Sequence, residues 1–444
     1  MKQKLFWRAS VLLLALILIS TVSLTSCSLL LDPSYSDILD SVDTDGLSSD
    51  TEVGAEDNDS KEDAVQNVTN NTVTITGNED NITYATACGL RSAVSVYCTF
   101  SATSGGTSYW NPTPSTYSYY TTGSGIIYRL ENDGSAFVVT NHHVVYDASS
   151  NTENGISDKI YVYLYGMENQ AYAIPATYVG GSASYDIAVL RVEKSDVLKD
   201  AIASGSASAV SVGDSDGVVP GMTTIAIGNP SASDGELGGL SVTQGIVSVD
   251  SEYITKTAND GSGEITVRVI RTDAPVNSGN SGGGMFNGKG ELIGIVNAKI
   301  SSSSVENIGY AIPSNVVRAV ADNIIDYCYG TDCESVMRGI LGITVETTAC
   351  STEYDTETGL IVKRETVGVY AVNAGGLGDG MLKVGDTVKA ITVGERTVTV
   401  TRQYHLIDAM LDVRVGDSVS MVIIRDGEEM TVNTTITEDC LTAY

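Results

Sequence analysis

Residues 272–283 read Thr272-Asp273-Ala274-Pro275-Val276-Asn277-Ser278-Gly279-Asn280-Ser281-Gly282-Gly283, and they follow a strand-like segment at 265–270. A serine among glycines directly after a strand is a common way of presenting a nucleophile. Because a serine hydroxyl is a weak nucleophile at its ordinary pKa, it needs a base to take its proton, a group to orient that base, and donors for the oxyanion. The stretch therefore predicts that partners for Ser281 lie elsewhere in the chain.

Candidates for the base and for the orienting acid lie upstream. His143 occurs in Thr140-Asn141-His142-His143-Val144, and Asp186 opens Asp186-Ile187-Ala188-Val189-Leu190. The chain order is His, Asp, Ser, with separations of 43 and 95 residues. Subtilisin-like enzymes have the order Asp, His, Ser and α/β-hydrolases the order Ser, Asp, His, so this is the chymotrypsin order. The alternative for Asp186 is a simple cap at the start of a strand.

The chain resembles the HtrA (DegP-like) family of trypsin-fold serine proteases in these motifs and in Gly309-Tyr310-Ala311-Ile312-Pro313-Ser314. The resemblance implies a mostly β fold, a chymotrypsin/trypsin-like double β-barrel followed by an α+β PDZ domain. A composition rich in Gly, Ser, Thr, Val and Tyr, with 18% charged residues, suits many short strands. The implied function is a serine endopeptidase that degrades unfolded or damaged exported proteins without a cofactor.

The resemblance also assigns roles at the site. Ser281 attacks the scissile carbonyl, His143 takes its proton, Asp186 fixes the imidazole tautomer, and the N–H groups of Gly279 and Ser281 form the oxyanion hole. His143 is preferred over His142 because the family motif puts the base immediately before Val-Val. Since neighbours on a strand point to opposite faces, we expect His142 to lie outward or behind the site.

The specificity pocket is predicted to be apolar. Pro275 stands six residues before the nucleophile, where trypsin-like enzymes that prefer basic side chains carry an acid. Val276, Asn297 and Ala298 complete the predicted pocket, and small aliphatic side chains are the family's expected substrates at the cleaved position. Lys299, the next residue in sequence, departs from the family pattern and puts a cation close to this pocket.

A second motif follows the protease region. The segment Met337-Arg338-Gly339-Ile340-Leu341-Gly342-Ile343 resembles the carboxylate-binding loop of a PDZ domain. In such a loop, backbone N–H groups bind a peptide C-terminus and the peptide adds as a strand. Gly339, Ile340, Leu341, Gly342 and Ile343 are therefore the predicted peptide-binding residues. An ordinary β-turn is the alternative.

The N-terminus resembles a bacterial lipoprotein signal peptide. Residues 1–27 contain a basic start, an apolar run from Ala9 to Val22, and Leu24-Thr25-Ser26-Cys27, which resembles a lipobox. The apolar run is short against the roughly 20 residues of a spanning helix, so cleavage before Cys27 and lipidation of its thiol are favoured over an uncleaved anchor. This predicts an exported protein, lipid-anchored to the outer face of the bacterial cytoplasmic membrane.

The next segment is strongly acidic. Residues 28–63 hold twelve Asp or Glu and one lysine, so we expect a disordered tether over 28–83 that holds the body away from the membrane, or simply a solvated acidic tail. The formal net charge of the chain is −30, which disfavours nucleic-acid binding and attachment to anionic lipid through basic residues.

Six cysteines remain besides Cys27. Grouping them by domain suggests three disulfides, and buried free thiols are the alternative; the suggested pairs are Cys88–Cys98, Cys328–Cys333 and Cys350–Cys440. No Cys or His cluster has the spacing of zinc ligands, so no metal is predicted.

The predicted domains are a trypsin-like protease over 84–330, ending in a helix at 313–327, and a PDZ domain over 336–440. A Tyr-rich insertion over 101–122 contacts a neighbouring subunit or packs onto its own barrel, and a homotrimer is the family expectation. Two other functions compete with proteolysis. One is a holdase or adaptor with its protease switched off; the other, a structural lipoprotein, leaves the His, Asp and Ser motifs unexplained.

Overall fold

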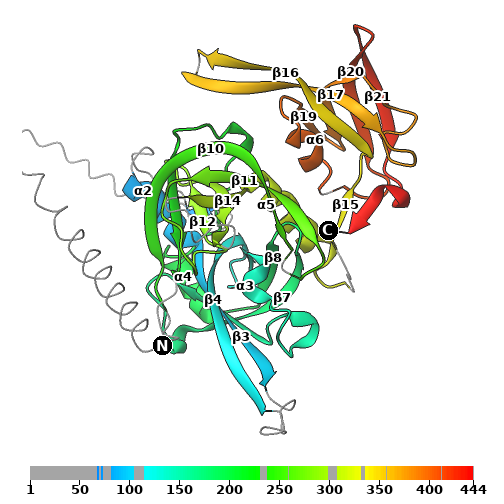
Figure 1. Ribbon diagram of the computed structural model, residues 1–444. Helices are drawn as coiled ribbons and strands as arrows, with labels where there is room; N and C mark the ends of the chain where they lie inside the picture. The colour runs from blue at the N-terminus through cyan, green and yellow to red at the C-terminus, as the bar shows by residue number, and fades with distance from the viewer. Residues whose placement is uncertain are drawn as a thin grey trace, which may run out of the picture. The chain divides into compact units, whose positions relative to one another are not determined.

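The computed structural model describes residues 68–69, 72–73, 82–104, 115–230, 238–258, 260–298, 308–331, 336–356, 358–411 and 413–443 (Figure 1). The predicted signal peptide with Cys27, and all but a few residues of the predicted tether, lie outside these ranges. The short strands β1 (Val68–Thr69) and β2 (Thr72–Val73) pair with each other. Within the described residues, no helix has both the length and the apolar character needed to cross a bilayer.

The first barrel is a closed antiparallel sheet of six strands in the order β3-β4-β5-β8-β7-β6. Its strands are β3 (Ala93–Ser104), β4 (Ser115–Leu130), β5 (Ala136–Thr140), β6 (Lys159–Leu164), β7 (Ile174–Ser182) and β8 (Ile187–Val192). Apolar side chains such as Val96, Ile127, Val138 and Leu190 fill its interior.

The second barrel repeats this architecture in the order β10-β11-β14-β13-β12-β9. Its strands are β9 (Thr223–Gly228), β10 (Ser241–Thr257), β11 (Glu264–Thr272), β12 (Gly284–Phe286), β13 (Leu292–Val296) and β14 (Gly309–Pro313). The long strand β10 curls around this barrel (Figure 1). Two closed barrels confirm the fold class predicted from the sequence.

Helices cover the barrels at a few places. They are α2 (Ile82–Ser92), α3 (His142–Val145), α4 (Asp196–Ala203) and α5 (Ser314–Tyr327), with 3-10 turns η3 (Glu153–Gly155), η4 (Gln170–Tyr172) and η5 (Ser215–Gly217). The predicted helical spacing of Val316, Val317, Val320 and Ile324 is confirmed in α5, where all four are buried. Helix α2 was not predicted, although the predicted protease domain begins at residue 84, within this helix.

The Tyr-rich insertion is mostly strand. β3 and β4 continue as an antiparallel ribbon as far as the pair Ser104 and Ser115. The Tyr119 hydroxyl donates to Asp147 Oδ2 at 2.6 Å, and its ring stacks on Phe100. Tyr120 stacks on Tyr97 of β3. These two tyrosines therefore pack onto their own barrel, whereas Tyr109 lies outside the described residues.

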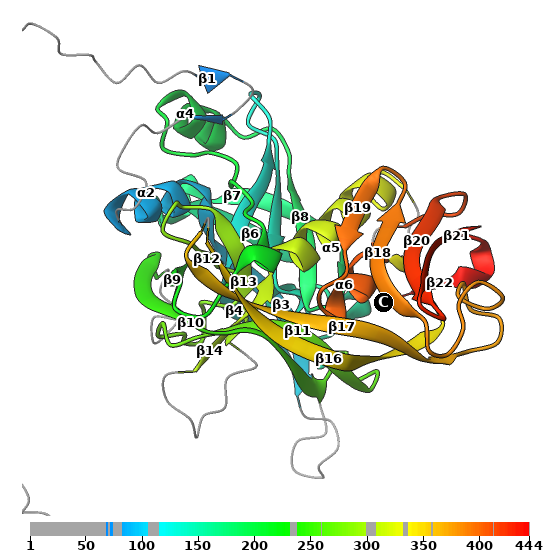
Figure 2. The same ribbon diagram turned by 90° about the horizontal axis from the view of Figure 1, so that it is seen from above.

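The C-terminal module is a sheet in the order β16-β17-β18-β20-β21, with β19 paired to β18 and a separate β15–β22 pair. Its elements are β15 (Met337–Gly339), β16 (Ile343–Asp355), β17 (Leu360–Val372), β18 (Thr387–Val393), β19 (Arg396–Thr399), α6 (Tyr404–Asp408), β20 (Ser418–Arg425), β21 (Glu428–Thr435), η8 (Glu438–Cys440) and β22 (Leu441–Ala443). β16 and β17 form a long two-stranded ribbon (Figure 2). Val367, Ile391, Leu406 and Met421 belong to this module's own core.

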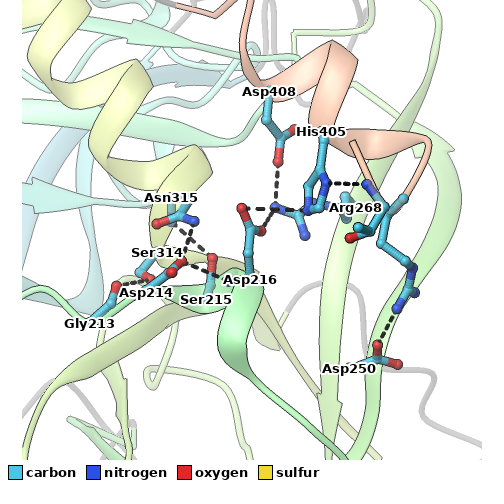
Figure 3. Close-up of polar contacts among 12 residues, drawn as sticks. Gly213, Asp214, Ser215, Asp216, Asp250, Arg268, Ser314, Asn315, His405 and Asp408 are labelled. Atoms are coloured by element: carbon cyan, nitrogen blue, oxygen red, sulfur yellow. Dashed lines mark hydrogen bonds and ion pairs between the residues drawn. The ribbon is translucent and has the colours of Figure 1, made fainter. Parts of the chain in front are cut away.

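Ion pairs join the C-terminal module to the β10–β11 hairpin. Arg268 of β11 lies between Asp216 and Asp408, and Arg402 donates to Asp250 of β10 at 2.7 Å (Figure 3). Arg268 is only 5% exposed, so these carboxylates compensate a charge that has lost its water.

Most of the suggested disulfides are wrong. Cys88, Cys98, Cys350 and Cys440 are free thiols; Cys98 and Cys440 are buried, as the alternative expected, whereas Cys350 is exposed. Cys98 lies within the first barrel's core, where burial raises the pKa of its thiol to about 12 and keeps it unreactive. Cys328 is in a disulfide, and its suggested partner Cys333 lies outside the described residues. Grouping by domain failed because cysteines of one domain need not be neighbours in space.

Candidate active site

His143 is positioned at the end of β5. The strand stops at Thr140, and the chain turns into α3, which begins at His142. Both histidines therefore lie in one helical turn, so the assumption that they alternate along a strand was wrong, whereas the position expected for His142 behind the site agrees with its burial. His142 is 6% exposed and stacks on Tyr146 at 4.9 Å between ring centroids, so it is buried behind the site.

Asp186 meets His143 directly. The imidazole Nδ1 lies 2.8 Å from Asp186 Oδ2, and the backbone N–H of His143 donates to Oδ1 at 3.0 Å. Asp186 is fully buried just before β8 and has φ +54, a left-handed conformation that costs a non-glycine residue strain energy. If Asp186 only capped β8, its carboxylate would not need to point toward His143 of α3.

Two further side chains donate to the same carboxylate. The Asn297 amide Nδ2 lies 2.8 Å from Asp186 Oδ2, and the Lys256 ammonium lies 3.0 Å from it. Burial alone would raise the pKa of Asp186, but the charges and hydrogen bonds of His143 and Lys256 outweigh it and lower that pKa below its usual range. The carboxylate therefore stays ionised at neutral pH.

The sequence analysis did not anticipate these two contacts. It placed Asn297 in the pocket, but its side chain is fully buried against Asp186. It did not single out Lys256 at all, because a lysine near the end of a long strand usually faces water. No sequence signal distinguishes it from such a residue.

The nucleophile loop presents Ser281 at the barrel interface. Gly279 has φ +94, a conformation that glycine adopts without strain. The Ser281 hydroxyl accepts the Ala298 N–H at 3.3 Å, and among the described contacts none joins it to His143. Such a bond is often long or absent before substrate binds. No described group accepts the N–H of Gly279 or of Ser281, so both are available to an oxyanion.

Ser124 connects this loop to the first barrel through hydrogen bonds. Its N–H donates to Ser281 O at 2.8 Å, and its hydroxyl donates to Gly279 O at 2.7 Å while accepting the Asn229 N–H at 2.8 Å. A Cβ on Gly282 would lie 2.1 Å from Ser124 O, so this close approach requires glycine. No motif in the sequence indicated this role for Ser124, which lies within β4.

Ser124→Ala is expected to lower kcat/KM by roughly 10- to 100-fold, because the Gly279 carbonyl loses the bond that orients the loop. The measurement is hydrolysis of a soluble peptide. Ser95→Ala is the matched control, since Ser95 pairs with Ser124 across β3 and β4 and its buried hydroxyl has no hydrogen-bond partner among the residues that the structure describes. An equal loss in both variants would contradict the assigned role of Ser124.

The predicted pocket residues lie beside the loop. Pro275 is exposed and Val276 is half-buried. Val276 packs against Gly309, since a Cβ added to this glycine would lie 2.7 Å from Val276 Cγ2. Ala298 is half-buried next to Ser281. Lys299 lies outside the described residues, so its effect on the pocket stays a prediction.

The predicted carboxylate loop opens the C-terminal module between β15 and β16. Gly339 N–H donates to Met410 O at 2.8 Å and Ile340 N–H to Cys440 O at 2.7 Å, so these two amides are already occupied. No described carbonyl accepts the N–H of Leu341 or Gly342. Ile343 begins β16, an edge strand.

The family model for a trypsin-like peptidase domain matches residues 123–295. With two barrels and this site, the chain has the architecture of the trypsin-like serine peptidase class. The Do-like HtrA serine protease of Lactococcus lactis subsp. cremoris (strain MG1363) is 32% identical over 326 residues, which cover 70% of this chain and 69% of the relative. The chain therefore belongs to the Do-like HtrA serine proteases, as its motifs predicted.

Two further proteins are similar to this chain. The Do-like HtrA of Bacillus subtilis (strain 168) is 34% identical over 314 residues, which cover 70% of this chain and 62% of the relative, so the chain spans less than two thirds of that protein. A solved structure described as HtrA-type protease AlgW with decapeptide is 25% identical with a TM-score of 0.47, over 80% of this chain and 97% of its own.

Proposed function

We propose that the protein hydrolyses peptide bonds through an acyl-enzyme formed on Ser281. His143 takes the hydroxyl proton and returns it to the leaving amine, and Asp186 holds the imidazole in the required tautomer. The N–H groups of Gly279 and Ser281 stabilise the oxyanion, each contributing on the order of 3 kcal/mol. The observation that carries this proposal is the 2.8 Å contact between His143 Nδ1 and the buried Asp186.

The proposed substrates are unfolded or damaged exported proteins cleaved after small aliphatic residues. An apolar pocket wall of Pro275, Val276 and Ala298, with no acid among them, favours side chains without charge. A peptide library digested by the full-length protein tests this. Cleavage after Val, Ala or Ile is expected, whereas a preference for Lys or Arg would contradict the pocket assignment.

A second activity is proposed for the C-terminal module, which would bind peptide C-termini in the manner of a PDZ domain. The unoccupied amides of Leu341 and Gly342 support it, with β16 as the edge to which the peptide adds. Calorimetry with one apolar peptide in two forms is the test. The free carboxylate should bind and the C-terminal amide should not; equal binding of both would refute the assignment.

The proposed location is the outer face of the cytoplasmic membrane, through a lipid on Cys27. Processing of Cys27→Ala is compared with that of the native chain by mass spectrometry of the membrane fraction. Loss of the lipid-modified N-terminus is expected. A variant still processed and membrane-held like the native protein would contradict the proposal.

A further inference from the structure

Lys256 brings a cation from the second barrel to the acid of the first. It lies near the end of β10, and its ammonium Nζ is 3.0 Å from Asp186 Oδ2. Its side chain is 14% exposed and that of Asp186 0%, so little water separates the two charges. Lysine is almost never this deeply buried without a partner. This contact is additional to the Ser, His and Asp of the proposed mechanism.

We propose that Lys256 is a positioning residue for catalysis: it holds the Asp186 carboxylate toward His143 and offsets part of its negative charge. The inference rests on the proposed function. Its consequence is that the pH dependence of kcat/KM depends on the charge carried at position 256.

The other groups around the pair do not duplicate this effect. Among the described residues, the charged or titratable side chains that contact Asp186 are His143 from α3 and Lys256 from β10, and Asn297 is neutral. Asp260, beyond the end of β10, interacts with His142 and with Tyr146 rather than with Asp186. Lys256 therefore places a fixed positive charge at the Asp186 carboxylate.

The sign of the expected effect follows from the shared oxygen. His143 Nδ1 and Lys256 Nζ both contact Asp186 Oδ2, so these nitrogens lie within about 6 Å of each other, where a like charge moves a titration by roughly one pH unit. The ammonium disfavours the imidazolium, which is the inactive form at low pH. Removing the ammonium should therefore move the acid limb of the activity profile to higher pH.

The test is the pH profile of kcat/KM for a soluble peptide, measured on full-length Lys256→Met, Lys256→Arg and Lys289→Met. The acid-side midpoint of Lys256→Met is expected to rise by roughly one pH unit, with Lys256→Arg close to the native midpoint. Lys289→Met is the matched control, because it removes one charge from an exposed position on the turn between β12 and β13. Its midpoint should not move.

The outcomes separate this inference from the proposed function. Lower activity in Lys256→Met with an unmoved midpoint indicates a merely structural role and overturns the proposal, as does an equal shift in Lys256→Arg. If Lys256→Met fails to fold, Lys256→Gln is measured against the same criterion. A Ser281→Ala protein that still cleaves the peptide would instead overturn the proposed function itself.

Discussion

Ser281→Ala and His143→Ala are each expected to remove nearly all peptide hydrolysis, by on the order of 10⁶ in kcat, and the double variant should be no slower than either. The losses do not add because the residues act as one unit. Without the serine there is no proton for the base to take, and without the base the hydroxyl is a weak nucleophile. The measurement is kcat for one chromogenic peptide in all three variants.

His142→Ala is the matched control for this experiment. The ring of His142 stacks on Tyr146, whereas His143 Nδ1 is the nitrogen that contacts Asp186. We expect a mild effect on turnover. If His142→Ala is inactive and His143→Ala is active, the base is assigned one residue too late. If neither matters, the chymotrypsin-type mechanism is wrong.

Asp186→Asn is expected to lower turnover by about 10⁴, because an amide favours the wrong imidazole tautomer. This substitution also leaves the Lys256 ammonium without its carboxylate in a site with little water. The free energy of unfolding should therefore fall by about 3 kcal/mol, a typical cost of an uncompensated buried charge.

A double variant separates the two effects of Asp186→Asn. Adding Lys256→Met should recover much of the lost stability, since no buried charge then remains unpaired, but it should not recover turnover. Thermal unfolding and kcat measured on both proteins test this. Recovery of turnover together with stability would mean that Asp186 acts only through folding, and its role as the orienting acid would have to be abandoned.

The holdase alternative is tested with the Ser281→Ala protein. Retained binding of an unfolded client, with loss of casein degradation, would show that binding and cleavage are separate properties of one chain. Degradation that persists in this variant would contradict the catalytic assignment.

The sequence predicted the fold and indicated the three candidate catalytic side chains because they lie in local motifs. His143, Asp186 and Ser281 each follow or precede a strand, and chain order distinguishes this arrangement from the other two orders. The strand pattern and the helical spacing of α5 were recognisable for the same reason, since their periodicity is set by neighbours in sequence.

Side chains that support the site from a distance were not predictable in this way. Lys256 is 70 residues from Asp186, and Ser124 is 155 residues from Gly279. Their contacts depend on how two closed barrels pack, which no local pattern encodes. The error about His142 has a different origin, because the strand was assumed to continue where α3 begins. Helix α2 was not predicted because many of its residues, such as Thr83, Thr86 and Gly89, have low helix propensity.

The central claim is that Ser281 is an activated nucleophile, and labelling with a fluorophosphonate tests it most directly. The Ser281 oxygen should attack phosphorus and release fluoride, giving one phosphonyl group per chain on the peptide that contains residues 272–283. His143→Ala should slow this labelling strongly, and Ser281→Ala should prevent it. A stable adduct on another residue would contradict the account, as would peptide cleavage by a protein that is not labelled at Ser281.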